Sequence, residues 1–225
     1  GTSCSSGHYD VIFNPECQVQ IFDVFTMPLS GKAAKDGLSP WRDKIGQSVS
    51  DARLSLSDQP LLVDGFGYEL FDAEGTQTKP TSLIANGQLQ SLLHNSATAA
   101  ACGTQTTGHA VRGPKSSLAV SAHQFVIDAG TAGLSELHSG DYIEVTDLSG
   151  LHSGANAISG DFSFGASGFL CRDGVRQQAL RGITVAGNFY KMLNQISCIG
   201  DTQHWNWQKS SLMAPIRFAE MAVSG

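Results

Sequence analysis

Residues 81–93 read Thr81-Ser82-Leu83-Ile84-Ala85-Asn86-Gly87-Gln88-Leu89-Gln90-Ser91-Leu92-Leu93. The pair Asn86-Gly87 separates two runs of mixed apolar and polar residues. Asn-Gly readily takes the positive φ angles of a type I′ turn, whose twist matches that of two antiparallel strands. The segment therefore predicts a β-hairpin. Asp173-Gly174 stands between residues 169–172 and 175–185 in the same way and predicts a second hairpin.

Further segments are typical of short strands. Polar and apolar residues alternate at 52–57 and at 141–146, which is the period of a half-buried strand. Extended character is also expected at 116–120 and 125–128. Residues 150–168 include five glycines, which indicates either a mobile loop or a surface rich in accessible backbone.

Three asparagines mark the expected starts of helices, because an asparagine side chain can cap the first turn. The predicted helices follow Asn14, Asn95 and Asn188. The last of them should continue to Ile196, since its apolar residues recur at helical spacing. The expected fold class is α+β: largely antiparallel, twisted β-sheets built from hairpins, with a few short helices packed on one face.

The composition excludes several classes of protein. Of 225 residues, 41% are hydrophobic and 15% are charged, which is apolar enough to fold and too polar for a membrane protein. The net charge of −6 argues against direct nucleic-acid binding. The five cysteines form no C-x-x-C pair, which fits free thiols in a reducing cytosol. We therefore expect a cytoplasmic protein with neither a membrane nor a nucleic acid as its direct partner.

The first residues differ in character from the rest. Residues 1–8 are rich in Gly and Ser and begin without Met, so we interpret them as a linker or an expression scar within a longer protein. Residues 9–225 are expected to form a single domain.

The sequence holds no compact catalytic motif. No histidine is followed by glutamate, and the two closest histidines are fourteen residues apart, so no helical turn presents two imidazoles to one ion. A metal site would need ligands from distant loops. Gly165-Ala166-Ser167-Gly168-Phe169 misses the nucleophile pattern G-x-S-x-G by one position. We therefore expect no catalytic residues, no metal ligands and no cofactor.

His109 belongs to a polar loop, Thr106-Thr107-Gly108-His109-Ala110, between a predicted helix and a predicted strand. Loops of this kind often carry binding groups. A lone histidine, however, is more often a hydrogen-bonded structural residue or an exposed one. The sequence leaves both interpretations open.

Six short segments follow one another in an order that is more specific than any of them alone. They are Phe71-Asp72-x-Glu74-Gly75-x-x-Thr78, Asn86-Gly87-x-Leu89, Thr107-Gly108-His109-Ala110, Gly160-Asp161-Phe162-Ser163-x-Gly165-Ala166-x-Gly168-Phe169, Gly182-Ile183-Thr184-Val185-Ala186-Gly187-Asn188 and Ile199-Gly200-Asp201. From Tyr9 to Val223 the chain resembles the C-terminal half of the PmbA/TldD family. The N-terminal domain of such a protein is therefore expected to precede it.

The resemblance implies a peptide-processing metalloprotease, also described as a modulator of DNA gyrase, that is built from two types of subunit. One type, TldD, carries a His-Glu-x-x-x-His zinc motif near the start of this half and a further cysteine ligand near the C-terminus. Here the expected helix reads Pro15-Glu16-Cys17-Gln18-Val19-Gln20-Ile21, and no cysteine follows Cys198. The chain therefore resembles the PmbA/TldE type, which lacks the motif.

The function expected from this resemblance is that of a non-catalytic, subunit-type domain. It would pair with a TldD-like zinc-bearing subunit, or with a second copy of itself, and would shape the chamber and the path of an unfolded peptide. The chain is not expected to be catalytic alone. The alternative is a regulatory module that binds a peptide or a protein, gyrase-modulator-like, without a protease partner.

An extended peptide can be held by main-chain hydrogen bonds at an exposed strand edge, which suits the small side chains around residues 163–168. The candidate residues of the peptide path are Thr107, Gly108, His109, Ser163, Gly165, Ala166 and Gly168.

Overall fold

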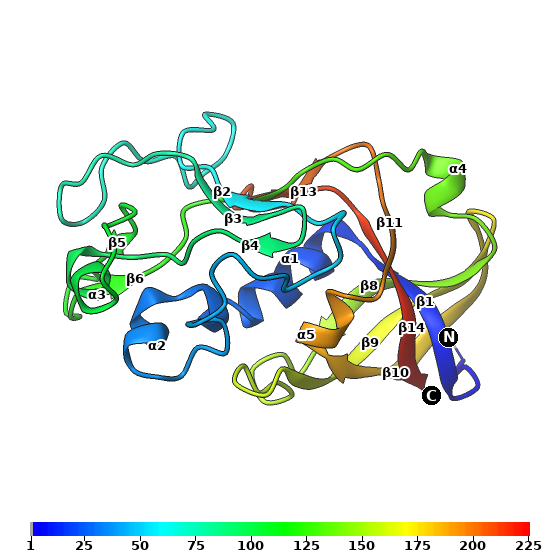
Figure 1. Cartoon of the computed structure of the whole chain (residues 1–225). Helices are drawn as coiled ribbons and strands as arrows, with labels where there is room; N and C mark the ends of the chain where they lie inside the picture. The colour runs from blue at the N-terminus through cyan, green and yellow to red at the C-terminus, as the bar shows by residue number, and fades with distance from the viewer. Residues whose placement is uncertain (1) are drawn as a thin grey trace. The chain divides into compact units, whose positions relative to one another are not determined.

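The computed structural model describes residues 2–225, which form two compact units (Figure 1). The first unit comprises the chain up to Phe25, residues 128–204 and residues 213–225. The second unit comprises residues 26–127 and 205–212. Each unit has a sheet and a buried core of its own, so each is described by itself.

Five strands of the first unit close into a ring. Their order is β1-β8-β9-β10-β14, and β1 also pairs with β14, so that each of the five has a neighbour on both sides. A further strand, β11, pairs with the part of β14 that β10 leaves free. The strands are β1 Gly7–Phe13, β8 Asp141–Ser149, β9 Asp161–Arg172, β10 Val175–Asn188, β11 Ile196–Ile199 and β14 Ile216–Ser224.

One pair in this ring departs from the antiparallel arrangement. β1 and β8 run parallel, with Val11 opposite Ile143 and Phe13 opposite Val145, whereas the other pairs are antiparallel. The sheet of the first unit is therefore mixed, which qualifies the expectation of a largely antiparallel α+β fold. The parallel pair joins segments far apart in the sequence, so no local turn signal indicates it.

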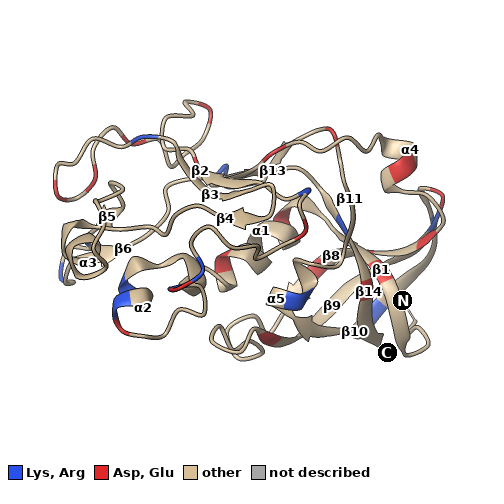
Figure 2. Ribbon diagram, viewed as in Figure 1, with Lys and Arg blue, Asp and Glu red and all other residues tan. Residues whose placement is uncertain are grey.

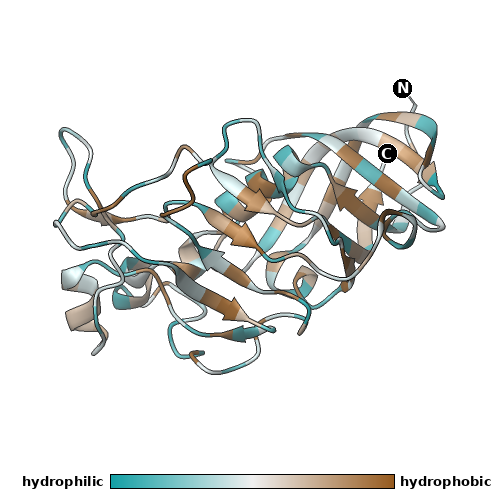
Figure 3. Cartoon of the chain, turned by 90° about the horizontal axis from the view of Figure 1, so that it is seen from above, coloured by the Kyte–Doolittle hydropathy of each residue, from teal (hydrophilic) through white to brown (hydrophobic). Residues whose placement is uncertain are grey.

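The core of the first unit follows from alternation along these strands. In β9, Phe162 and Phe164 are buried while Asp161 and Ser163 are exposed, as the two faces of a strand require. Figure 3 shows apolar and polar residues alternating along the strands near the two ends of the chain. Phe13 of β1 meets Phe218 of β14 edge to face, with ring centroids 6.0 Å apart.

The predicted hairpin at Asp173-Gly174 is confirmed. It joins β9 to β10, and both turn residues have positive φ, 49° for Asp173 and 80° for Gly174. Near its tip, Arg172 forms a two-pronged ion pair with Asp141 of β8.

The first predicted helix is also confirmed. α1, Pro15–Val24, begins after Asn14, whose side-chain oxygen accepts a hydrogen bond from the Cys17 amide at 2.8 Å. Shortly beyond the helix, Phe25 stacks on Phe189 with ring centroids 4.4 Å apart. α1 is thereby fixed to the core of the first unit.

The helix predicted from Asn188 to Ile196 is wrong in its length. Asn188 caps a single turn, α5 Phe189–Met192, and Ile196 already belongs to β11 opposite Phe218. The apolar spacing reflects a buried turn followed by a buried strand, because pairing with β14 prevails over helical continuation. The remaining helix of this unit is α4, Leu134–Leu137.

The second unit is built on a sheet of short strands. Its order is β12-β13-β7-β2-β3-β4, and a separate pair, β5-β6, lies outside that sheet. The strands are β2 Leu56–Asp58, β3 Thr81–Ala85, β4 Gln88–Leu89, β5 Ala110–Val111, β6 Ala119–Val120, β7 Phe125–Ile127, β12 His204–Trp205 and β13 Ser211–Met213. The first residue of β12 and the last residue of β13 fall at the boundary with the first unit. Three short helical segments are η1 Met27–Leu29, α2 Gly31–Lys35 and α3 Ser96–Ala101.

The local signals in the second unit are largely confirmed. Asn86 and Gly87 form the expected turn between β3 and β4, with φ angles of 47° and 81°. Asn95 caps α3 through the Thr98 amide at 2.9 Å. The strand predicted at 52–57 begins only at Leu56, because the Asp51 carboxylate accepts from the Arg53 amide and holds the preceding residues in a turn.

Charged side chains are dispersed over both units. Lys and Arg occur singly along the ribbon in Figure 2 and are interspersed with Asp and Glu. Among residues 2–225, no helix has the length and apolar character needed to cross a bilayer.

Candidate functional site

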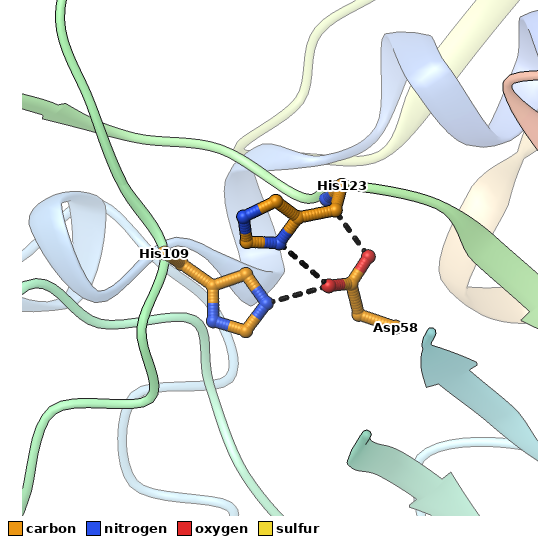
Figure 4. A group of neighbouring side chains, drawn as sticks. All are labelled: Asp58, His109 and His123. Carbon is orange, nitrogen blue, oxygen red and sulfur yellow. Dashed lines mark hydrogen bonds and ion pairs between the residues drawn. The ribbon is translucent and has the colours of Figure 1, made fainter. Parts of the chain in front are cut away.

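Two histidines from separate parts of the second unit meet at the carboxylate of an aspartate (Figure 4). Asp58, the last residue of β2, is fully buried. Its Oδ2 lies 2.7 Å from His109 Nε2 and 3.1 Å from His123 Nδ1. We call Asp58, His109 and His123 the Asp–His cluster.

The second oxygen of Asp58 is held by the backbone. Asp58 Oδ1 accepts hydrogen bonds from the amides of His123 at 2.8 Å and Gln124 at 2.7 Å. These two amides lead directly into β7, which pairs with β2. The carboxylate is therefore fixed in orientation by the sheet.

His109 is placed by the loop that precedes β5. Gly108 has φ of 73°, a conformation that glycine adopts without strain, and turns the chain so that the imidazole is buried. The Nδ1 atom of His109 lies 2.8 Å from Thr107 Oγ1. On the other side, the Ala110 amide donates to the Asp72 carboxylate at 3.0 Å. The loop is thus tied down on both sides of the histidine.

His123 occupies the edge of the cluster. Its side chain is 7% exposed, and its Nε2 lies 3.7 Å from a carboxylate oxygen of the more exposed Glu69. Both residues line a cavity of about 280 Å³, together with Gly67 and Ala110. The cluster is therefore buried on the Asp58 and His109 side and open toward a cavity on the His123 side.

The electrostatics of the cluster favour an ionised carboxylate. Burial acts to raise the pKa of Asp58, but hydrogen bonds from His109 and His123 outweigh it and hold that pKa below its ordinary value. Burial acts to lower the pKa of His123, but the hydrogen bond and the charge of Asp58 raise it above its ordinary value. His94 differs, since burial lowers its pKa.

The cluster brings together chemistry of three kinds. A buried carboxylate can orient an imidazole, it can stabilise an imidazolium, and with two ring nitrogens it can supply three ligands to a cation. Among residues 2–225 this is the group whose His, Cys, Asp and Glu ligand atoms converge, all within 4.8 Å of one another.

The sequence-predicted candidates fall into two sets. The Asp–His cluster includes His109 and lies beside Thr107 and Gly108. His109 is buried and hydrogen-bonded, as the structural interpretation of this histidine expects. Four others belong to β9 in the first unit. They are Ser163, Gly165, Ala166 and Gly168.

The expectation of an unpaired strand edge in β9 is wrong. Gly165, Ala166 and Gly168 have partners in both β8 and β10, so their main-chain groups are used within the sheet. Ser163 pairs with Ala186 of β10 and also donates its amide to the Gly154 carbonyl. The glycine-rich composition has a structural cause at Gly168, where a Cβ atom would lie 1.9 Å from the Glu144 carbonyl oxygen.

Sequence reasoning missed Asp58 and His123. Asp58 follows directly on the predicted strand 52–57, and His123 lies fourteen residues after His109, just before the predicted strand at 125. The available signal for this site was a polar residue next to each of two predicted strands, Asp58 after the first and His123 before the second. We expected no metal ligands because the sequence does not show that the loops carrying His109 and His123 meet at the end of β2.

The start of α1 is occupied by structural contacts. Cys17 and Gln18 are each 2% exposed. Gln18 donates its amide to the Ala214 carbonyl at 2.9 Å and accepts from the Ile216 amide at 3.0 Å. Burial raises the pKa of the Cys17 thiol to about 12, which keeps it a neutral, packed group.

The closed sheet of the first unit and the short-stranded sheet of the second define a strand-rich α+β domain. The chain belongs to the family of PmbA/TldA metallopeptidase C-terminal domains, whose model matches residues 6–225.

Relatives and solved structures agree with this assignment. The chain is 30% identical over 226 residues to the Metalloprotease PmbA homolog of Haemophilus influenzae, covering 98% of this chain and 47% of the relative. It is 29% identical over 220 residues to the Metalloprotease PmbA of Escherichia coli O157:H7, covering 96% and 45%. The chain therefore spans about half the length of these relatives.

Two solved structures share the fold. A Thermotoga maritima protein described as a candidate modulator of a DNA gyrase matches with a TM-score of 0.90 and 26% identity, over 100% of this chain and 51% of its own. TldE from Thermococcus kodakarensis matches with a TM-score of 0.86 and 24% identity, over 99% and 51%. The latter likeness concerns the fold.

Proposed function

We propose that this domain is the non-catalytic, subunit-type part of a TldD/PmbA-like peptide-processing metalloprotease, and that it shapes the chamber and the peptide path for a zinc-bearing partner. The observation that carries the proposal is the sequence Pro15–Ile21 at the start of α1, which has no histidine where the family resemblance places the zinc motif.

The contacts of α1 support this role. Gln18 bridges to the backbone around β14, and Cys17 packs in the core, so neither side chain points to an accessible ligand site. A helix that fixes a sheet in this way contributes stability and shape rather than chemistry. Two relatives carry the name metalloprotease, which supports a role of this domain in peptide processing.

Exposed apolar side chains support a protein partner. Val63 is 77% exposed and Phe66 is 81% exposed, both in the loop that follows β2. Large apolar residues gathered in one exposed loop are typical of surfaces that contact another polypeptide. We propose that the partner is a TldD-like subunit, or a second copy of this chain, in the cytoplasm.

The peptide path remains part of the proposal, in a narrower form. Ser163 and Thr107 retain side-chain exposure, whereas His109, Ala166 and Gly168 are buried. Because β9 is paired on both sides, we expect any peptide to meet exposed side chains rather than to add a strand there.

Co-purification tests the assembly. The full-length protein is co-expressed with a TldD-like homologue from the same organism, and the mass of the complex is measured by light scattering after gel filtration. A stable complex that contains both chains supports the proposal. A lone homodimer that never retains the homologue and has no peptidase activity favours the regulatory module instead.

Two surface variants sharpen this test. Phe66→Ser removes an exposed apolar group from the loop after β2, and Val175→Ser does the same at the β9–β10 turn, where Val175 is 59% exposed. We expect Phe66→Ser to weaken the complex and Val175→Ser to leave it intact.

A further inference from the structure

We propose that Asp58, His109 and His123 bind one divalent transition cation of the zinc class in the second unit. This inference goes beyond the proposed function, because the site is separate in sequence from α1 and does not depend on a partner subunit. Its support is the convergence of the three side chains and the environment that holds each of them.

The ligand set suits such a cation. Two imidazole nitrogens and one carboxylate oxygen form the three-residue set that zinc accepts when a fourth position is left to water or substrate. The His109 Nε2, His123 Nδ1 and Asp58 atoms lie within 4.8 Å of one another. Ligands at about 2.0–2.1 Å from a tetrahedral ion stand roughly 3.3 Å apart. The nitrogen–oxygen distances of 2.7 and 3.1 Å would therefore need to open by about 0.6 and about 0.2 Å.

Each ligand is oriented by a further group. The amides of His123 and Gln124 hold Asp58 Oδ1, which leaves Oδ2 facing the imidazoles. The Thr107 hydroxyl lies 2.8 Å from His109 Nδ1 and can accept the ring hydrogen there. When a cation replaces the hydrogen bond between His109 Nε2 and Asp58, the ring keeps its hydrogen on Nδ1 and offers the Nε2 lone pair to the cation. Outer contacts of this kind fix ligand rings in metal sites.

Charge also favours a cation. Asp58 is 0% exposed, and a buried carboxylate needs a compensating positive charge. A second carboxylate, Glu69, lies 3.7 Å from His123 Nε2 on the cavity side. A divalent ion at the cluster would compensate Asp58 directly and would be attracted by Glu69.

A cavity lies beside His123, which lines it together with Glu69, the carboxylate near its Nε2 atom. Its volume of about 280 Å³ exceeds what a single water needs, and it reaches His123 and Glu69.

The competing account is a hydrogen-bonded Asp–His cluster that binds no ion. Metal titration separates the two accounts. The full chain is stripped with a chelator and titrated with Zn²⁺ by calorimetry, while Co²⁺ is titrated in parallel and followed by its visible absorption. We expect one equivalent of Zn²⁺ to bind, and Co²⁺ to give the intense bands of a four- or five-coordinate site.

Variants assign the ion to the cluster. Asp58→Asn and His123→Gln should each abolish the stoichiometric uptake, whereas His152→Gln, at an exposed histidine of the first unit, should leave it unchanged. Thr107→Val tests positioning, and we expect it to weaken Zn²⁺ binding by about 10–100-fold while Co²⁺ retains the same type of spectrum.

The absence of Zn²⁺ uptake by the unaltered chain would overturn the inference, as would uptake that survives both cluster variants. Because the Co²⁺ spectrum is recorded on the unaltered chain, the test holds even if a variant fails to fold. Binding to a TldD-like subunit is measured separately, so the failure of either proposal leaves the other distinguishable.

Discussion

Asp58 and His109 are 51 residues apart in the sequence and meet in the interior of the second unit, where Asp58 Oδ2 and His109 Nε2 are separated by 2.7 Å. The same carboxylate accepts hydrogen bonds from the backbone amides of His123 and Gln124, which directly precede β7, the strand that pairs with β2. One side chain thus joins β2, the loop before β5 and the loop before β7. The predictions below start from this relationship.

Asp58→Asn should destabilise the protein by about 1–3 kcal/mol. The amide oxygen can still accept both backbone hydrogen bonds, but the amide NH2 group then faces the imidazoles, which lose their charged acceptor. Urea unfolding measures the change. Asp43→Asn is the matched control, because Asp43 is 87% exposed and its ion pair with Arg42 lies on the surface. Equal stability of the two variants would contradict a structural role for the cluster.

The contribution of His123 should depend on pH with a definite sign. Because Asp58 raises the pKa of His123 in the folded state, the folded protein binds the proton more tightly than the unfolded chain. The resulting stability is fully present below the ordinary histidine value of 6.5 and is lost as pH rises through the raised value.

Unfolding of the metal-free protein by urea, compared at about pH 6 and about pH 8.5, checks this sign. The unaltered protein should lose more stability over this interval than His123→Gln does. His152→Gln should behave like the unaltered protein. A His123→Gln variant with the full pH dependence would show that another group titrates.

The cysteines should differ strongly in reactivity. Cys17 is 2% exposed with its pKa raised to about 12, whereas Cys102 is exposed after α3. Only the thiolate reacts with alkylating reagents. Mass spectrometry after a brief treatment of the native protein at mildly alkaline pH should find Cys102 modified and Cys17 intact. Rapid labelling of Cys17 would mean that α1 is not packed as described.

Gly168→Ala should destabilise the first unit by about 1–3 kcal/mol, since a Cβ atom would be forced against the backbone of β8 at Glu144. Gly133→Ala is the control, because no atom lies within 4 Å of a Cβ atom there and φ is −69°. Thermal unfolding compares the two variants. If Gly168→Ala is tolerated as well as the control, then β8 and β9 do not approach each other as closely as described.

Short-range features of the fold could be predicted from the sequence. The turns at Asn86-Gly87 and Asp173-Gly174 and the caps at Asn14 and Asn95 depend on a few neighbouring residues, and each is present. Their chemistry is local, so the sequence carries the whole signal.

Features that depend on distant partners could not be predicted. Ile196 has helical spacing but joins a strand because it pairs with Phe218, and the parallel pairing of Val11 with Ile143 has no local signature. The same holds for Asp58 and His123, because nothing in the sequence reveals that the end of β2 meets the loop before β7. His109 could be identified as a candidate, but its partners required the structure.

The most direct test of the proposed function is peptidase activity in a reconstituted system. The full-length protein, a TldD-like homologue from the same organism and their equimolar mixture are each loaded with Zn²⁺ and given an unfolded peptide. We predict that cleavage requires the homologue, that the mixture cleaves faster than the homologue alone, and that the full-length protein by itself leaves the peptide intact. Cleavage by the purified full-length protein alone would contradict the proposal.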